Sequence, residues 1–280
     1  MAEDWSVQEV KIIVRDYFSM LVQEQRGEPY SKAEHWRALI PQLNGRSKQS
    51  IEFKLANISA VLSKYGYPYI FGYKPRGNFQ KLLETEVLGY LNQHVPTLAP
   101  LFEAYADAPV REQADDTSPD FAHCEELAPE PSPAREEEER QFRTIKIDYS
   151  EREQRNRTVG STGEQFVIAY EQWRLAEAGR DDLIPLIKWV SKEEGDGAGY
   201  DILSRNVDGT PRYIEVKSTK LGKEAPIYVS ATEIAFASRH TENFYLYRVF
   251  DLAGKKRLFI KQGSFEQYCR LTPVTFRGIF

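Results

Sequence analysis

Apolar residues along the first hundred positions recur with the three- and four-residue spacing of amphipathic helices. The first such run follows Ser6, a favourable N-cap residue, and ends at Gly27. Three further runs with the same period lie at about 31–43, 51–66 and 79–91. This pattern predicts a helical N-terminal domain.

The second half of the chain has a different pattern, in which short alternating runs typical of strands stand between helical ones. Helices are expected at about 161–178 and from a Ser230 cap to about 239. Strands are expected at 186–191, from 201, and at 213–217, 228–229, 244–250 and 258–260. The order predicts an α/β core with a mixed sheet flanked by helices, within a two-domain α+β protein.

A segment unlike either domain separates them. Residues 103–140 carry 3 basic and 13 acidic residues, among them the run Glu136–Glu139, and are rich in proline. Such a composition does not bury enough apolar surface to offset chain entropy, so a flexible tether is expected rather than a specific acidic motif. The predicted division is therefore a helical domain at 1–102, a linker at 103–143 and an α/β domain at 144–280.

Composition limits the chemistry and the compartment. The two cysteines and four histidines are scattered without zinc-ligand spacing, which favours a reducing, cytoplasmic setting and gives no His-based catalytic site. The first residues do not resemble a signal peptide. The longest uncharged stretch, 87–102, contains polar residues and two prolines, so no membrane span is expected.

The residues that indicate chemistry lie on two neighbouring predicted strands. Glu215 and Lys217 alternate with apolar residues, so they point to the same face. Asp201 opens the preceding strand, and Asn206–Gly209 is a hairpin signal between the two. If the strands pair, Asp201 comes close to Glu215. Two carboxylates beside an ammonium describe a site for Mg²⁺, with Mn²⁺ as substitute, that leaves positions for water and phosphate.

A further acid lies upstream. Glu164 stands near the start of a helical run, and Ser161 or Thr162 is expected to cap that helix, which would place Glu164 in its first turn. Asp201, Glu215 and Lys217 can instead form an ordinary solvated face of a sheet, because a Glu-X-Lys triplet alone is common. A nuclease-like core that binds without cutting is the other alternative.

These residues carry a family resemblance. Glu164, Asp201 and Glu215-Val216-Lys217 resemble the PD-(D/E)XK nuclease core in its Mrr-like form, with Tyr200 where the motif's name has proline. Residues 145–280 are similar to bacterial proteins whose C-terminal domain is shared with the plant protein NO VEIN. The similar segments are Trp189-Val190-Ser191, Gly195-Asp196-Gly197, Gly199-Tyr200-Asp201-Ile202, Glu215-Val216-Lys217-Ser218-Thr219, Tyr228-Val229-Ser230 with Glu233, and Leu246-Tyr247-Arg248-Val249-Phe250. The resemblance implies a restriction-endonuclease-like fold.

The N-terminal domain has the layout of a helix-turn-helix. Asn44-Gly45 joins two predicted helices, and the second begins with polar and basic residues, as in a helix that enters the major groove. The candidates for phosphate or base contact are Arg46, Lys48, Gln49, Lys54 and Asn57. A helical bundle with a polar helix start is the alternative. Residues 1–90 also resemble the module that accompanies NO VEIN-type or HNH nuclease domains in bacteria.

The segment 65–79 interleaves aromatic and basic residues, which suits either base stacking or a hairpin packed on the bundle. Lys74 and Arg76 are its better candidates for ligand contact. In the C-terminal domain Lys220 is a candidate for phosphate contact, as are Arg239 and Arg248. Glu233 is a candidate for supporting the site from the next helix, as are Ser218 and Thr219.

Together these features predict a Mg²⁺-dependent DNA endonuclease that serves restriction-type defence against foreign or modified DNA. Asp201 and Glu215 would hold the ion, Lys217 would assist the attacking water, and Glu164 would orient a ligand or a second ion. Cleavage of double-stranded DNA needs two sites, so a homodimer is expected. A helicase or another defence protein is a further expected partner, and a non-catalytic nucleic-acid-binding or scaffold subunit is the rival interpretation.

Overall fold

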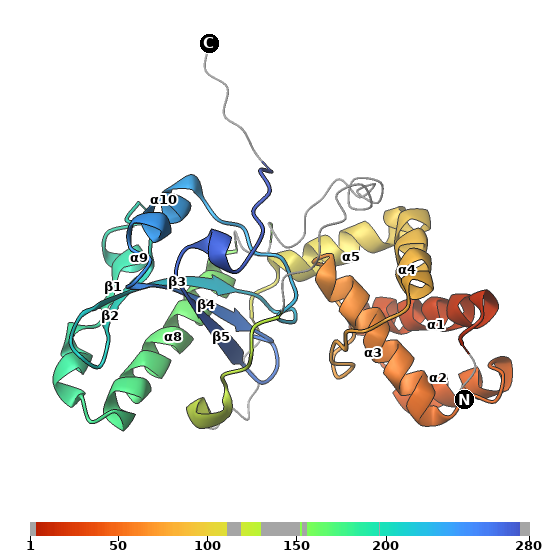
Figure 1. Cartoon of the computed structure of the whole chain (residues 1–280). Helices are drawn as coiled ribbons and strands as arrows, with labels where there is room; N and C mark the ends of the chain where they lie inside the picture. The colour runs from red at the N-terminus through yellow and green to blue at the C-terminus, as the bar shows by residue number, and fades with distance from the viewer. Residues whose placement is uncertain (1–3, 111–118, 130–151, 153–155, 196, 275–280) are drawn as a thin grey trace, which may run out of the picture. The chain divides into compact units, whose positions relative to one another are not determined.

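The computed structural model describes residues 4–110, 119–129, 152, 156–195 and 197–274. They form two compact units (Figure 1). Unit 1 comprises Met1–Pro109, Ala134–Asn156 and Leu221–Pro226, and unit 2 comprises Val110–Pro133, Arg157–Lys220 and Ile227–Phe280. No described helix has the length and apolar character needed to cross a bilayer.

Unit 1 is helical, as predicted. Its described helices are α1 (Val7–Arg26), α2 (Lys32–Leu39), α3 (Lys48–Lys64), α4 (Lys81–Gln93) and α5 (Val95–Asp107) (Figure 1). Ser6 caps α1 in a full capping box with Glu9, which satisfies amides that the first turn leaves unpaired. Tyr17 of α1 lies in the core, where its hydroxyl is 2.7 Å from Ser59 Oγ of α3. The same hydroxyl accepts a hydrogen bond from the Ile70 amide, so α1 also positions the segment after α3.

Helix α5 was not predicted from the sequence. The last helix of this domain was expected to end at about 91, but Pro96 occupies the first turn of α5, where a missing amide hydrogen costs nothing. Leu98 and Phe102 are buried on one face of α5. Packing of that face therefore outweighs the local effect of Pro100.

Unit 2 contains an open five-stranded sheet in the order β1-β2-β3-β4-β5 (Figure 1). The strands are β1 (Lys188–Trp189), β2 (Ile202–Arg205), β3 (Pro211–Ser218), β4 (Phe244–Phe250) and β5 (Arg257–Gln262). Neighbours pair antiparallel except β3 and β4, which are parallel. The sheet is therefore mixed, as predicted.

A helix covers each face of this sheet. The described helices of unit 2 are α8 (Arg157–Glu177), the short α9 (Val190–Glu193) and α10 (Ala231–Arg239). Ile214 and Val216 of β3 share an apolar cluster with Val167 of α8. Phe244 and Leu246 of β4 share another with Ala237 of α10. Because side chains alternate along a strand, Glu215 and Lys217 lie on the α10 side.

Close approach of α8 to β3 requires a glycine. A Cβ atom at Gly163 would lie 1.7 Å from Ser218 Oγ and 2.7 Å from Ser218 Cβ, far inside van der Waals contact. Gly199 meets a similar limit, because its φ is +85° and a Cβ there would lie 2.7 Å from Phe236 Cβ. These two glycines set how closely α8 and α10 approach the strands that carry the candidate site.

Several local predictions differ from the structure. Helix α8 begins at Arg157, so Ser161 and Thr162 are interior residues and not caps. Both hydroxyls donate back to the Thr158 carbonyl, which satisfies them inside the helix. The strand expected at 186–191 is shortened to β1 because Val190 starts α9, and 228–229 is not a strand.

Part of the segment predicted as a linker has a defined place in unit 2. Cys124 is buried in the core, and Glu125 forms a parallel bridge with Leu258 of β5. The Leu258 amide donates to the Cys124 carbonyl at 3.0 Å. Cys124 and Phe121 pack in an apolar cluster of unit 2. The sequence did not predict this, because such residues are too few among the acids to change the composition of the segment. Positions 111–118 and 130–143 lie outside the described residues.

Candidate active site

The pairing of β2 with β3 brings the two predicted metal ligands together. Ile202 pairs with Ile214, and Asp201 directly precedes this pair, close enough to Glu215 for its charge to act on that carboxyl. The Asp201 amide donates to the Ile214 carbonyl at 2.9 Å, and Asp201 Oδ2 accepts from the Val216 amide at 2.8 Å. Asp201 is therefore fixed to β3 by its backbone and by one carboxylate oxygen.

Lys217 lies between two carboxylates. Its Nζ is 2.6 Å from Oε1 of Glu215 and 2.7 Å from Oε2 of Glu233. Lys217 and Glu215 are 6% and 3% exposed, so both charges are held away from bulk water. Such short contacts between buried opposite charges fix the orientation of both side chains.

Glu233 reaches this position from the first turn of α10. Ser230 caps the helix, and its hydroxyl accepts from the Glu233 amide at 3.2 Å. In return the Ser230 amide donates to Glu233 Oε2 at 3.3 Å. The predicted cap at Ser230 is thus confirmed. The oxygen that completes the capping box is the same oxygen that accepts from Lys217.

Glu164 approaches from α8. Its Oε2 accepts hydrogen bonds from Trp189 Nε1 and Ser191 Oγ, which fix the carboxylate. Glu164 lies two turns into the helix and not in the first turn, because α8 starts earlier than the sequence indicated. It is close enough to Asp201 for its charge to act on that carboxyl.

The carboxylates of the cluster repel one another. Burial, and then the charge of Glu164, raises the pKa of Asp201 from 3.8 to about 7. Burial and the charge of Asp201 raise the pKa of Glu215 above its usual value. Burial opposes the charged form of Lys217, but Glu215 and Glu233 outweigh burial and hold its pKa above the usual range. An additional cation between Asp201 and Glu215 would relieve this repulsion.

The chemistry of these donors fits Mg²⁺ or Mn²⁺. Carboxylate oxygens are the ligands that hard divalent cations prefer, and Mg²⁺ commonly uses one or two of them with water and phosphate oxygens. Asp201 and Glu215 supply that set. Within the described part of the chain no group of three or more His, Cys, Asp or Glu side chains is arranged to hold a metal ion.

A comparison with family models gave a match over the part of the chain that carries this site. Residues 163–261 match the family model described as protein NO VEIN, C-terminal. Searches of curated proteins and of solved structures returned no match.

The NO VEIN C-terminal match covers the residues of the candidate site. It begins at Gly163, beside Glu164, continues through β1 to β4 and α10, and ends in β5. Asp201, Glu215, Lys217 and Glu233 therefore all lie within it. Unit 1 apart from Leu221–Pro226 lies outside the match, and the PD-(D/E)XK resemblance stays a prediction.

Three of the predicted DNA-contacting residues are used inside unit 1 instead. Arg46 donates through Nε to Glu9 Oε1 at 2.9 Å and through Nη2 to Glu9 Oε2 at 3.1 Å, an internal bidentate ion pair. Lys54 is buried, with Nζ over the Trp5 ring. Asn57 is also buried and donates to the Arg76 carbonyl at 2.7 Å. These contacts contradict the prediction that the three residues bind DNA, because their partners lie far away in the sequence and the helical pattern does not reveal them.

Lys220 in unit 2 requires the same correction. It is 6% exposed and has partners of its own, so it does not present its charge at the surface. Lys48, Gln49, Lys74 and Arg76, by contrast, are exposed. Most aromatics of 65–79 are partly buried against the core of unit 1, which favours the alternative of a segment packed on the bundle, whereas Phe71 is 57% exposed.

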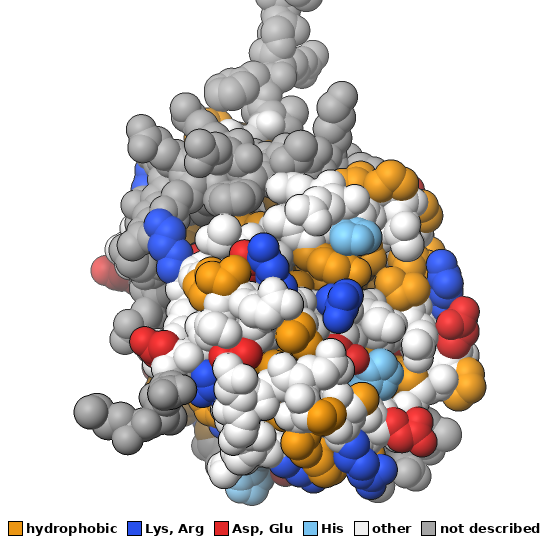
Figure 2. All heavy atoms as spheres, turned by 90° about the vertical axis from the view of Figure 1, so that its right-hand side faces the viewer, with side chains coloured by type: hydrophobic (Ala, Val, Ile, Leu, Met, Phe, Trp, Pro, Cys, Tyr) orange, Lys and Arg blue, Asp and Glu red, His pale blue; other side chains and the backbone are white. Residues whose placement is uncertain are grey.

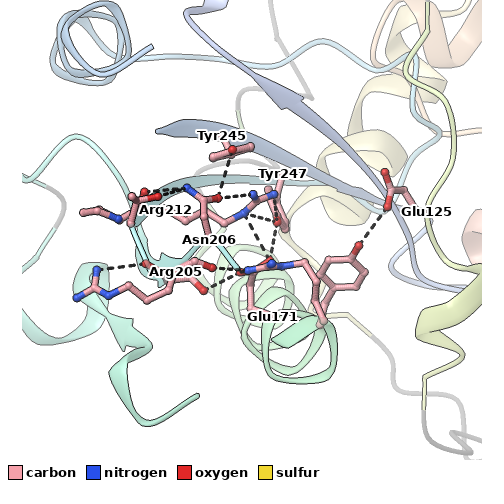
Figure 3. A network of polar contacts seen from close by, with 12 residues as sticks. Glu125, Glu171, Arg205, Asn206, Arg212, Tyr245 and Tyr247 are labelled. Atoms are coloured by element: carbon pink, nitrogen blue, oxygen red, sulfur yellow. Dashed lines mark hydrogen bonds and ion pairs between the residues drawn. The ribbon is translucent and has the colours of Figure 1, made fainter. Parts of the chain in front are cut away.

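A buried polar network on the α8 side was not predicted. Glu171 of α8 is fully buried, accepts from Arg174 Nε at 2.8 Å and Ser204 Oγ at 2.6 Å, and receives the Tyr247 hydroxyl at 2.6 Å. Figure 3 shows Glu171 facing Arg212 and Tyr247 of the sheet. Arg174 Nη2 lies 2.7 Å from Glu171 Oε2 and Arg212 Nε lies 3.8 Å from Glu171 Oε1, so the Glu171 charge is compensated. The only sequence signal was the i, i+3 spacing of Glu171 and Arg174.

The raised pKa of Asp201 predicts a pH-dependent cost to stability. Between the unfolded value of 3.8 and about 7 the folded state binds more protons, so the free energy of unfolding falls as pH rises through this window. Asp201→Asn keeps an oxygen for the Val216 amide and removes the charge. It should raise the free energy of unfolding at pH 8 by up to about 4 kcal/mol, and by little at pH 4. Urea denaturation at both pH values measures this.

The exposed Asp181→Asn provides the control, because the same chemical change at the surface should stay within about 0.5 kcal/mol at either pH. If Asp201→Asn is less stable than wild type at pH 8, or changes stability equally at pH 4 and pH 8, the surroundings of Asp201 do not disfavour its charged form.

Proposed function

We propose that the chain is a Mg²⁺-dependent DNA endonuclease that hydrolyses phosphodiester bonds. The observation that carries this proposal is the pairing of β2 and β3, which brings Asp201 beside the strand of Glu215, with Lys217 Nζ 2.6 Å from Glu215 Oε1. Two hard carboxylate donors next to a buried ammonium match the needs of phosphodiester hydrolysis. Such a reaction requires a cation for the phosphate oxygens and a positive group near the attacking water.

In this mechanism Asp201 and Glu215 hold the divalent ion at the α10 side of the sheet. When bound, the ion polarises the phosphodiester and lowers the pKa of a coordinated water. The ammonium of Lys217 positions the attacking water or offsets the charge that develops on the phosphate. Trp189 and Ser191 orient Glu164, whose carboxylate faces the charge of Asp201.

Unit 1 is proposed to contact the DNA through exposed residues on α3 and the segment after it. The buried amide of Asn57 donates to the carbonyls of Arg76 and Gly77, and the Arg76 amide donates to the Ala56 carbonyl. These bonds hold the Arg76 backbone on α3, with its guanidinium 5.2 Å from the centre of the Phe53 ring. Phe53 is 46% exposed, so this pair presents an aromatic face and a cation to solvent.

Charge at this surface suits a phosphate backbone. Lys74 and Arg76 make no ion pair with any described residue, whereas Lys48 lies 3.7 Å from Glu52. On the face of unit 1 that Figure 2 presents, Lys and Arg side chains are interspersed with hydrophobic ones and do not form one continuous basic patch. Lys74 and Arg76, followed by Lys48 and Gln49, are therefore the preferred DNA contacts.

The biological setting is part of the same proposal. A nuclease domain joined to a separate DNA-binding unit suits restriction-type defence against foreign or modified DNA. A homodimer would supply one active site for each strand. A helicase or another defence protein is a further proposed partner, and plain, methylated and hydroxymethylated DNA compared side by side would identify the substrate.

Cleavage of plasmid DNA with Mg²⁺ or Mn²⁺ tests the activity. Lys217→Ala removes the group that offsets phosphate charge and Asp201→Asn removes a ligand, so each should lower the rate by about a hundredfold or more. Glu177→Gln, at an exposed position of α8, should cut at the wild-type rate. Cutting that survives Lys217→Ala would point to another site or a contaminant. Wild-type binding without cutting would favour the non-catalytic alternative.

DNA affinity measured against salt concentration tests the surface on unit 1. Lys74→Gln and Arg76→Gln should each weaken binding and reduce the slope of log affinity against log salt by about one. Lys11→Gln, an exposed lysine on α1, should change neither quantity. Equal effects of all three substitutions would mean that unit 1 attracts DNA only through its overall charge.

A further inference from the structure

Glu215 has two roles in the proposed reaction that compete. As a ligand it must turn a carboxylate oxygen to the divalent ion, yet its Oε1 lies 2.6 Å from Lys217 Nζ in the present arrangement. If Glu215 were the sole partner of Lys217, its one negative charge would have to serve both the buried ammonium and the divalent ion. Removing one partner of a buried ion pair is strongly unfavourable.

Glu233 resolves this conflict because it is a second carboxylate on the same ammonium. Its Oε2 accepts from Lys217 Nζ at 2.7 Å, and its side chain is 19% exposed. The contact does not depend on Glu215, because Glu233 comes from α10 and Glu215 from β3. Lys217 can therefore keep one anionic partner while Glu215 turns to a cation.

The position of Glu233 is fixed by the start of α10. The Ser230 amide donates to the same Oε2, and the N-terminal end of a helix favours a carboxylate. Helix α10 is held on the sheet by Ala237, which is fully buried, and by Phe236 packed 5.2 Å from the Tyr213 ring on β3. The carboxylate that Lys217 needs is thus set by helix packing.

We propose that Glu233 is a positioning residue of the candidate nuclease site, which retains the ammonium of Lys217 when Glu215 binds the divalent ion. The inference rests on the proposed function. Glu233 does not touch the ion or the substrate; it acts through Lys217. In its absence Lys217 would have to keep Glu215 as its partner, and the site would bind the ion more weakly.

Titration of the full chain with Mn²⁺, with free Mn²⁺ followed by electron paramagnetic resonance, tests the proposal. Glu233→Gln keeps an oxygen for the Ser230 amide and loses the charge. It should weaken Mn²⁺ binding by about ten- to a hundredfold, the worth of one charge-assisted hydrogen bond. Ser230→Ala breaks the cap and keeps the Glu233 charge, so it should bind Mn²⁺ within about twofold of wild type.

The double variant decides whether Glu233 acts through Lys217. In a Lys217→Gln background Glu215 is no longer held by an ammonium, so adding Glu233→Gln should change Mn²⁺ affinity by less than about twofold. A purely structural role for Glu233 would give the same loss in both backgrounds. If Glu233→Gln does not fold, Glu233→Asp shortens the reach to Lys217, and its effect should likewise require Lys217.

The outcomes separate this inference from the proposed function. If wild type does not bind Mn²⁺, the metal-dependent function and the inference both fail. If wild type binds Mn²⁺ and Glu233→Gln binds it equally well, only the inference fails. It also fails if the loss persists in the Lys217→Gln background, because Glu233 would then act on the ion directly.

Discussion

The contact of one buried ammonium with two carboxylates is the constraint on which the arrangement of unit 2 depends. Lys217 is on β3, the central strand, and its partners Glu215 and Glu233 come from that strand and from α10. Buried charges are tolerated only when they are paired and hydrogen-bonded. The register of β3 and the position of α10 must therefore be correct together, or Lys217 loses its partners.

The two faces of β3 differ in how their buried charges are compensated. On the α8 side, Ile214 and Val216 pack in an apolar cluster and the charge of Glu171 is fully compensated by its neighbours. On the α10 side, the carboxylates of Asp201, Glu215 and Glu233 lie close enough together for the charge of one to raise the pKa of another. The first arrangement stabilises the sheet. The second leaves a repulsion between carboxylates that a divalent cation would relieve, and this difference is why the α10 side is the candidate site.

Sequence patterns predicted the parts of this structure that depend on local periodicity. The alternation at Tyr213–Lys217, the hairpin before it and the Ser230 cap led to the sheet, to the meeting of Asp201 with Glu215, and to α10. They did not reveal the start of α8, whose hydroxyl residues bond within the helix, or α5, which tolerates its prolines because Leu98 and Phe102 are buried. Partners distant in sequence were also invisible. The helical pattern predicted that Arg46 and Lys54 are exposed, whereas Arg46 binds Glu9 and Lys54 lies over the Trp5 ring.

The central claim is that Asp201 and Glu215 share one divalent cation while Lys217 stays beside them. The most direct measurement is a crystal structure of the full chain with Mn²⁺, using the anomalous scattering of the metal to locate it. The account predicts a single strong peak in contact with carboxylate oxygens of both Asp201 and Glu215, with Lys217 Nζ retained by Glu233. A well-ordered site without a peak at saturating Mn²⁺, or a peak bound elsewhere, would contradict it.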